Sequence, residues 1–195
     1  MDTESPDALD KQDMARLCGG HDAALNDLMS RHAQRLFHYL IRQLQDESEA
    51  EDVAQETFVR VFQHRQKYDA KYRFSTWLYT IATNLARNHQ RWRTRHPYVS
   101  LEAENEGTGA GLKDKIAALE ATPDESMMSD ERAQTVRAAI AQLPEDLRTV
   151  LILFEYERQS QQEIAVVMEC TPKAVEMRLY HARKQLRELL SKFLA

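Results

Sequence analysis

The sequence has 195 residues and a net charge of −5, with 43% hydrophobic and 29% charged residues. This balance excludes a disordered chain, and the low content of glycine and proline, five of each, favours an all-helical protein. No apolar run approaches the ~18 residues that a membrane span needs, and the acidic, polar beginning of the sequence does not have the pattern of a signal peptide.

Charge alternates in blocks along the sequence. Residues 60–96 hold nine bases and one acid, and residues 170–195 hold six bases and two acids. In residues 1–59 and 100–130, by contrast, acids outnumber bases. Because basic patches attract polyanions, the two basic blocks are the candidate nucleic-acid surfaces.

The first half of the chain is predicted to form a tail followed by helices. Residues 1–13 are expected to be a flexible tail. Apolar residues then recur at steps of three and four from Met14 to Leu44, which predicts one short and one longer helix. Ser48 and Glu51 form a possible capping box for a helix over about 49–65. A further helix is expected to run through residues 74–95 and to end at His96-Pro97.

The second half is predicted to form a separate helical unit. Residues 98–128 are acidic and glycine-containing and are expected to be a flexible linker. A first helix of the unit should end at Leu143-Pro144, and a second should cover about 145–157. Ser160 and Glu163 predict a capping box, and Thr171-Pro172 predicts the start of the last helix.

Residues 160–189 have the spacing of a helix-turn-helix. A short helix, a turn and a capped helix follow one another, with a shared core expected from Ile164, Val167, Val175 and Leu179. In this motif the second helix enters the major groove of DNA. Glu169 occupies a turn position where glycine is common. The alternative, an ordinary helical hairpin with a solvated charged face, stays open at this point.

The first basic block has a different pattern. No acidic residue occurs from 73 to 95, and Thr80, Asn84, Arg87, Arg91 and Arg95 follow one another at helical steps. Aromatic side chains beside arginines suit single-stranded nucleic acid, because unpaired bases stack on rings while cations hold the backbone. Phe74 lies where this basic row begins, whereas Trp77 is expected to be core.

Three segments together resemble the sigma-70 family, and most closely its small extracytoplasmic-function (ECF) sigma factors. They are DVAQETFVRVFQ (52–63), FSTWLYTIATNLARNHQR (74–91) and QEIAVVMECTPKAVEMRLYHARKQLRELL (162–190). The resemblance implies an RNA polymerase subunit, not an enzyme, with a sigma-2 domain over 14–97 and a sigma-4 domain over 129–195. It also implies that the linker threads the RNA path of the polymerase.

The resemblance implies three sets of site residues. The set that holds the single-stranded −10 element is Phe74, Ser75, Thr76, Asn84, Arg87, Asn88 and Arg91. The set that reads the −35 duplex is Lys173, Glu176, Met177, Arg178, Tyr180, His181 and Arg183. The set that binds the clamp helices of the polymerase β′ subunit is Asp52, Gln55, Glu56 and Arg60, although these could equally be a solvated, salt-bridged face.

Partners and cofactors follow from the same reading. The implied partners are core RNA polymerase, through the β′ clamp helices and the β flap, promoter DNA, and an anti-sigma factor that could hold the protein at the membrane. Two distant cysteines, Cys18 and Cys170, fit a reduced, cytoplasmic protein. No metal or cofactor is predicted, because Cys18 and His21 lack a second pair of ligands. The alternative function is a helix-turn-helix transcription regulator that binds duplex DNA without polymerase.

Overall fold

The computed structural model describes residues 6–96 and 133–193, and all the regular structure in these two ranges is helical. The first range, here called the first unit, contains α1 (Pro6–Cys18), α2 (Ala24–Leu44), α3 (Glu47–Gln63), the 3-10 turn η1 (Arg65–Lys67) and α4 (Phe74–Arg95). The second range, called the second unit, contains a helix over 133–141, α6 (Glu145–Glu155), α7 (Gln161–Val167) and α8 (Pro172–Phe193). The predicted all-helical fold is confirmed for these residues, and the predicted linker, 98–128, lies outside them.

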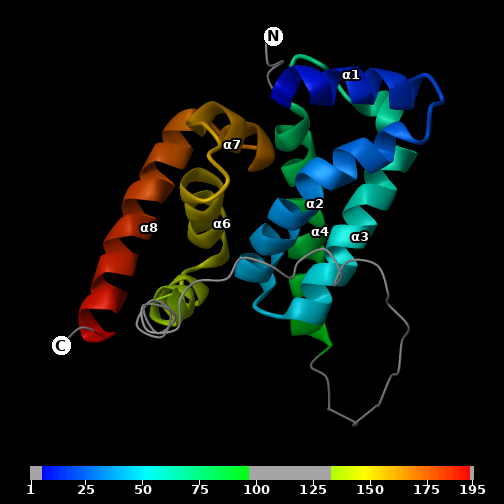
Figure 1. The fold of residues 1–195 in the computed structure, drawn as a ribbon. Helices are drawn as coiled ribbons and strands as arrows, with labels where there is room; N and C mark the ends of the chain where they lie inside the picture. The colour runs from blue at the N-terminus through cyan, green and yellow to red at the C-terminus, as the bar shows by residue number, and fades with distance from the viewer. Residues whose placement is uncertain (1–5, 97–132, 194–195) are drawn as a thin grey trace, which may run out of the picture.

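Helices α2, α3 and α4 lie side by side in the first unit, and α1 lies across one end of this layer (Figure 1). Large side chains from all three helices fill the core without exposure to solvent, among them Tyr39, Val61 and Phe74. Helix α3 begins two residues earlier than expected, because Asp46, and not Ser48, accepts the cap hydrogen bond from the Glu49 backbone N–H at 2.9 Å.

The prediction of a flexible tail is wrong for residues 6–13, which form most of α1. Two carboxylates fix this helix to α2. Asp10 accepts from Arg31 Nε at 2.9 Å and lies 2.8 Å from His32 Nε2, and Asp13 accepts from Arg31 Nη2 at 2.6 Å. Pairing with cations therefore allows these acidic residues, which suggested a solvated tail, to be buried. A count of apolar residues does not detect such pairing.

The helix-turn-helix of the second unit is confirmed. Ser160 and Glu163 form the predicted capping box of α7, and α8 begins at Pro172 as predicted. The shared core is also as expected, since Ile164, Val167 and Val175 are fully buried. Glu169 lies in the turn with a φ of 51°, in the left-handed region that glycine prefers.

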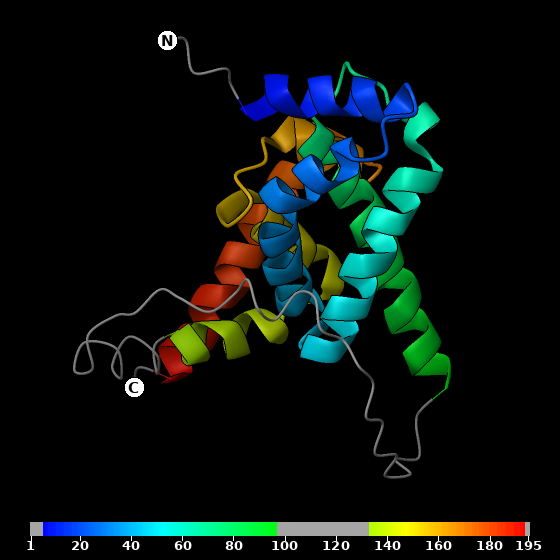
Figure 2. The same cartoon turned by 45° about the vertical axis from the view of Figure 1, so that its right-hand side comes forward.

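The two units pack directly against each other. Figures 1 and 2 both place α6 and α7 beside α2 and α4, and the contacts of α4 with α7 and of α2 with α6 agree. Buried apolar residues of both units belong to one continuous cluster, which includes Leu78 of α4 and Ile152 of α6. This contact determines which predicted site residues are accessible.

Candidate nucleic-acid and polymerase surfaces

One face of α4 exposes a polar row made of Asn84, Asn88 and Arg91. Steps of four and three residues place the three side chains on the same side of the helix. None of them is tied to another residue of the described ranges. Amides can pair with base edges and a guanidinium can hold a phosphate, so this row is equipped to bind one nucleic-acid strand.

The beginning of α4 is closed instead. Phe74 and Thr76 have no exposed surface and Ser75 is also buried. The Phe74 ring packs in the core, with its centroid 5.0 Å from that of His32 and 6.4 Å from that of Tyr68. Ser75 and Thr76 lie under the second unit. The three residues predicted to hold an unpaired base are therefore not part of the exposed row in this conformation, and their role stays a prediction.

Arg87 lies between these two groups and is engaged by the second unit. Its Nε donates to Glu145 at 3.1 Å, and its Nη2 donates to Asp146 at 3.0 Å. Trp77, by contrast, is half-buried against the core beside Tyr68, which confirms its predicted core position. Of the predicted −10 set, the structure brings Asn84, Asn88 and Arg91 together at the surface and covers the rest.

A buried polar network lies at the contact between the two units, and sequence reasoning missed it. The Tyr79 hydroxyl donates to the Glu157 carboxylate, which also lies 3.6 Å from Arg35 Nε. Burial raises the pKa of Glu157 above its ordinary value, although Tyr79 and Arg35 act in the opposite direction. Burial, and then the neighbouring carboxylate, raise the pKa of Tyr79, which keeps it a hydrogen-bond donor. No local pattern could reveal the network, because its members are far apart in the sequence.

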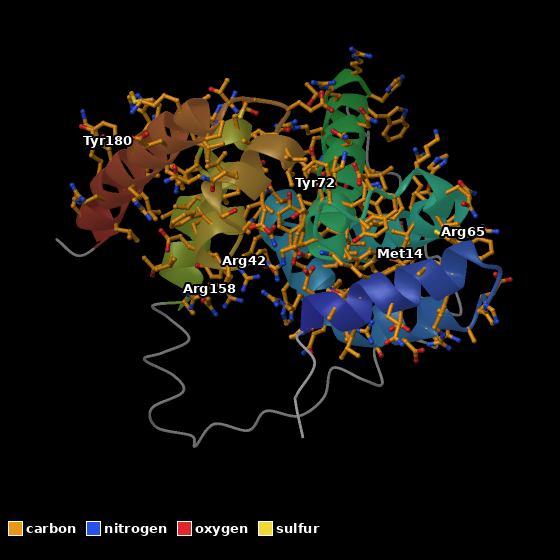
Figure 3. The ribbon with its side chains drawn as sticks, turned by 90° about the horizontal axis from the view of Figure 1, so that it is seen from above. Met14, Arg42, Arg65, Tyr72, Arg158 and Tyr180 are labelled. Carbon is orange, nitrogen blue, oxygen red and sulfur yellow. The ribbon has the colours of Figure 1, made fainter. Side chains whose placement is uncertain are left out.

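The outer face of α8 carries most of the predicted −35 set. Tyr180 is 62% exposed and points away from the other helices (Figure 3), and Lys173, Met177 and His181 are also exposed. Lys173 Nζ pairs with Glu176 at 2.9 Å, which offsets the repulsion that this acid would exert on phosphate.

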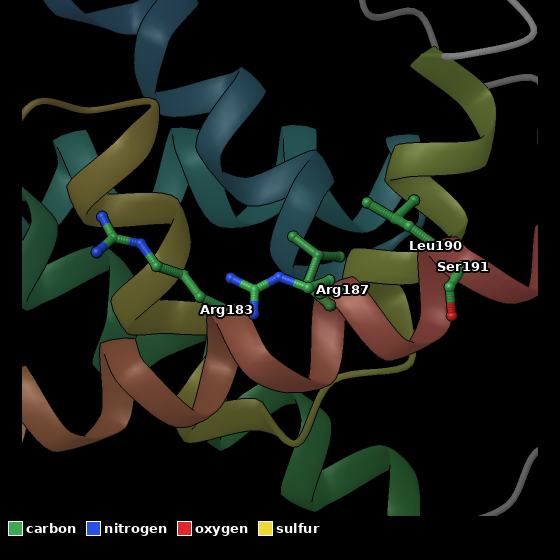
Figure 4. A pocket seen from close by; sticks show the side chains of 5 residues that line it. Arg183, Arg187, Leu190 and Ser191 are labelled. Carbon is green, nitrogen blue, oxygen red and sulfur yellow. The ribbon is translucent and has the colours of Figure 1, made fainter. Parts of the chain in front are cut away.

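Two arginines of the −35 set differ in position. Arg178 turns toward the body of the second unit, where its Nη2 lies 3.2 Å from Asp146. Arg183 is exposed and pairs with Glu155 at 2.7 Å. Further along α8, Arg183 and Arg187 flank a shallow apolar groove that includes Leu190 (Figure 4). Six of the seven predicted −35 residues, Arg183 included, therefore lie on the open face of α8, whereas the Arg178 side chain points toward Asp146.

The predicted polymerase surface on α3 is exposed. Asp52, Gln55 and Arg60 face solvent, and Glu56 accepts from Arg60 Nε at 2.7 Å. Beside it lies an apolar groove of about 630 Å³ between α2 and α3. The groove is lined by Leu25, Met29, Phe58, Val59 and Phe62, together with polar residues at its rim. The sequence signal that could have indicated it is Val59, an apolar residue on the polar face of α3 that is 46% exposed.

Neither metal-binding nor membrane-spanning features occur in the parts of the chain that the structure describes. Residues 6–96 and 133–193 hold no group of three His, Cys, Asp or Glu side chains placed to bind a metal ion. No helix in the same ranges combines the length and apolarity that crossing a membrane requires. Cys18 and Cys170 are free thiols.

Comparisons with known proteins agree with this combination of a basic helical unit and a helix-turn-helix. Residues 28–96 match the family model of sigma-70 region 2, and residues 133–186 match that of sigma-70 region 4. The chain is 37% identical over 190 residues to the RNA polymerase sigma-H factor of Pseudomonas aeruginosa, with 95% of each chain covered. It is 33% identical to the ECF RNA polymerase sigma factor SigW of Bacillus subtilis, with 88% of this chain and 91% of SigW covered.

Solved structures share the fold. CnrH in complex with the cytosolic domain of CnrY superposes with a TM-score of 0.69 at 23% identity, covering 94% of this chain and 98% of CnrH. The sigma factor RpoE in complex with the anti-sigma factor NepR from Bartonella quintana gives a TM-score of 0.65 at 20% identity, covering 87% of this chain and 98% of RpoE.

A region 2 unit followed by a region 4 helix-turn-helix defines the class of RNA polymerase sigma factors, which are non-catalytic subunits. The chain belongs to the sigma-70 family and is an ECF RNA polymerase sigma factor. The sequence-based identification of the family is therefore confirmed.

Proposed function

We propose that the chain binds core RNA polymerase and directs it to promoters through two different DNA contacts. The α4 row of Asn84, Asn88 and Arg91 holds the separated −10 strand, and the open face of α8 reads the −35 duplex. The observation that carries this proposal is the α4 row itself, which presents base-pairing amides and a phosphate-binding cation on a helix without acids. A regulator that binds duplex DNA through its helix-turn-helix does not need this second row.

Core binding is assigned to the exposed α3 face. Asp52, Gln55 and the ion pair of Glu56 with Arg60 form a charged strip beside the apolar groove. An apolar centre with a charged rim is the usual composition of a protein interface, and a surface ion pair of this kind contributes only about 0.3–0.5 kcal/mol to folding. Stability alone therefore gives little reason for the strip.

Control by an anti-sigma factor is part of the proposal. A solved sigma factor with the same fold, RpoE of Bartonella quintana, is in complex with the anti-sigma factor NepR. A partner that covers the α3 face would prevent polymerase binding. The protein would then act in the cytoplasm and would be held at the membrane only through that partner.

The experiment is transcription in vitro with purified core polymerase and a pool of genomic fragments, with start sites mapped. The N84A/R91A variant should still bind core polymerase but should lose permanganate reactivity of unpaired thymines at the −10 region. N26A is the matched control, because Asn26 is an exposed asparagine of α2 that belongs to neither the α4 row nor the α8 face. Strand opening by the N84A/R91A holoenzyme at the wild-type level, or a tight duplex footprint by the chain without polymerase, would refute the proposal.

A further inference from the structure

Two stacked rings lie at the exposed end of α4. Trp92, in the last turn of the helix, is 50% exposed, and its indole packs on the imidazole of His96, with ring centroids 5.0 Å and planes 26° apart. We call these two residues the terminal ring pair. Figures 1 and 2 place this end of α4 at the side of the first unit opposite α1. Half of the Trp92 surface is therefore available for contact with another molecule.

The terminal ring pair is held in a defined orientation. The His96 backbone N–H donates to the Trp92 carbonyl at 2.9 Å, and His96 Nδ1 lies 3.1 Å from the same oxygen. Another part of this turn is fixed to α3, because Arg93 Nη1 donates to both carboxylate oxygens of Glu49, at 3.0 and 2.9 Å. A ligand that stacks on the pair therefore has little to order, and such pre-organisation raises affinity.

The pair borders the α4 row of Asn84, Asn88 and Arg91. Trp92 follows Asn88 by four residues and precedes Arg95 by three, so the three side chains are neighbours on the helix surface. The eight residues from Asn84 to Trp92 rise by about 12 Å at about 1.5 Å per residue. Because stacked nucleotides of one strand lie about 3.4 Å apart, this distance corresponds to about three to four nucleotides. The ring pair would thus meet the same strand as the row.

The charges around the pair suit an unpaired strand. Arg91 precedes Trp92 and Arg95 follows it, and both arginines are exposed. Helix α4 has no acidic residue, and Glu49 of α3 is paired with Arg93. Proteins that bind single strands combine an aromatic ring, on which a base stacks, with cations that follow the phosphates. In a duplex the faces of the bases are already stacked on one another, so this combination favours unpaired bases.

We propose that the terminal ring pair is a further binding site for single-stranded DNA, at which one unpaired base of the promoter stacks on Trp92. The inference rests on the proposed function, because it extends the strand contact of the α4 row by one base. Arg95 holds the phosphate beside that base. His96 is a positioning residue, which fixes the orientation of the indole and does not itself bind the base.

The test measures binding of the holoenzyme, assembled from core polymerase and the full chain, to fork DNA whose −10 region is unpaired on the non-template strand. The DNA sequence is that of a promoter with a mapped start site. W92A should weaken binding by about 5- to 100-fold, the range that corresponds to one stack of a base on an aromatic ring. Each base of the unpaired strand is then replaced in turn by an abasic site. At one position the abasic site should weaken binding by the wild type by a similar factor and should leave binding by W92A unchanged, because the stack is already lost.

Four further variants separate stacking from other effects. W92F keeps an aromatic ring and should weaken binding by about threefold or less, whereas W92L keeps an apolar side chain without a ring and should resemble W92A. W92L also keeps the inference testable if W92A fails to fold. T94A is the control, because Thr94 is exposed in the same turn and, two residues further on, points to the other side of the helix. H96A should weaken binding in the wild type but not in W92A, which a general loss of stability would not produce.

The outcomes distinguish this inference from the proposed function. A loss in W92A that disappears at one abasic position supports the site. Wild-type binding by W92A, or an equal loss at every abasic position and on fully paired DNA, would overturn the site and leave the proposed function intact. A loss of affinity for core polymerase alone would assign Trp92 to the polymerase surface and would also overturn it. If the wild-type holoenzyme did not bind fork DNA at all, the proposed function would fail, and the inference with it.

Discussion

Glu169, in the turn of the helix-turn-helix, has an unfavourable backbone conformation that lowers the stability of the fold. One substitution should remove this loss of stability. Glu169 has a φ of 51°, and a non-glycine residue in this region costs about 1–2 kcal/mol. The Glu169 side chain is exposed, and two backbone hydrogen bonds close the turn, from Glu169 N to Val166 O at 3.2 Å and from Cys170 N to Ala165 O at 2.9 Å. Glycine can keep both bonds.

We expect E169G to be more stable than E169A by about 0.5–1 kcal/mol. Glycine avoids the cost of the left-handed conformation but loses about 0.5–1 kcal/mol through the greater freedom of its unfolded chain. For a chain of this size the difference corresponds to a rise in Tm of about 1–4 °C. Thermal and urea unfolding followed by circular dichroism would measure it.

E169A is the appropriate reference, because it removes the same side chain and retains the backbone cost. An E169G protein that unfolds at or below the E169A midpoint would show that the turn is not strained at this residue. Wild-type levels of −35 duplex binding by both holoenzymes would show that the comparison reports on stability and not on a lost DNA contact.

Three further predictions concern the core, the α1 network and the α8 face. L153A should lower the free energy of unfolding by about 2–5 kcal/mol in urea titrations, because Leu153 is fully buried and its loss leaves a cavity. Burial alone would raise the pKa of Asp10, but His32 and Arg31 outweigh it and hold the pKa below its ordinary value of 3.8. The ionised Asp10 carboxylate therefore stabilises the fold above about pH 4, and this contribution is lost as the pH falls through the folded-state pKa. The difference in unfolding free energy between wild type and D10N should shrink below about pH 4. R183A should reduce the slope of log affinity against log salt for holoenzyme on duplex promoter DNA by about 0.9, and an unchanged slope would exclude a phosphate contact at Arg183.

Most features that depend on neighbouring residues were predictable from the sequence, although the cap of α3 is Asp46 and not Ser48. The Ser160–Glu163 box and the Thr171-Pro172 start of α8 were located correctly, because capping chemistry involves residues within one turn. The helix-turn-helix core followed from the spacing of apolar residues for the same reason. The sequence marked Glu169 only as a position where such turns often have glycine, and its φ of 51° explains that preference.

Features that depend on distant partners were not predictable. Asp10 and Asp13 belong to a helix only because Arg31 and His32 of α2 neutralise them. Ser75 and Thr76 could be assigned to a DNA surface by resemblance, but their burial depends on Gln159, more than eighty residues away. Ion pairs and hydrogen bonds of this kind leave no period in the sequence, so single-sequence reasoning cannot place them.

The contact between the two units follows from the same physical property that suits α4 to DNA. A row of cations without acids attracts any anionic chain, and a tethered acidic segment is present at a far higher effective concentration than DNA. The contact divides the predicted −10 residues into an accessible group, Asn84, Asn88 and Arg91, and a covered group, Ser75, Thr76 and Arg87. The accessible row is therefore the part of the predicted −10 surface that this conformation offers to a strand.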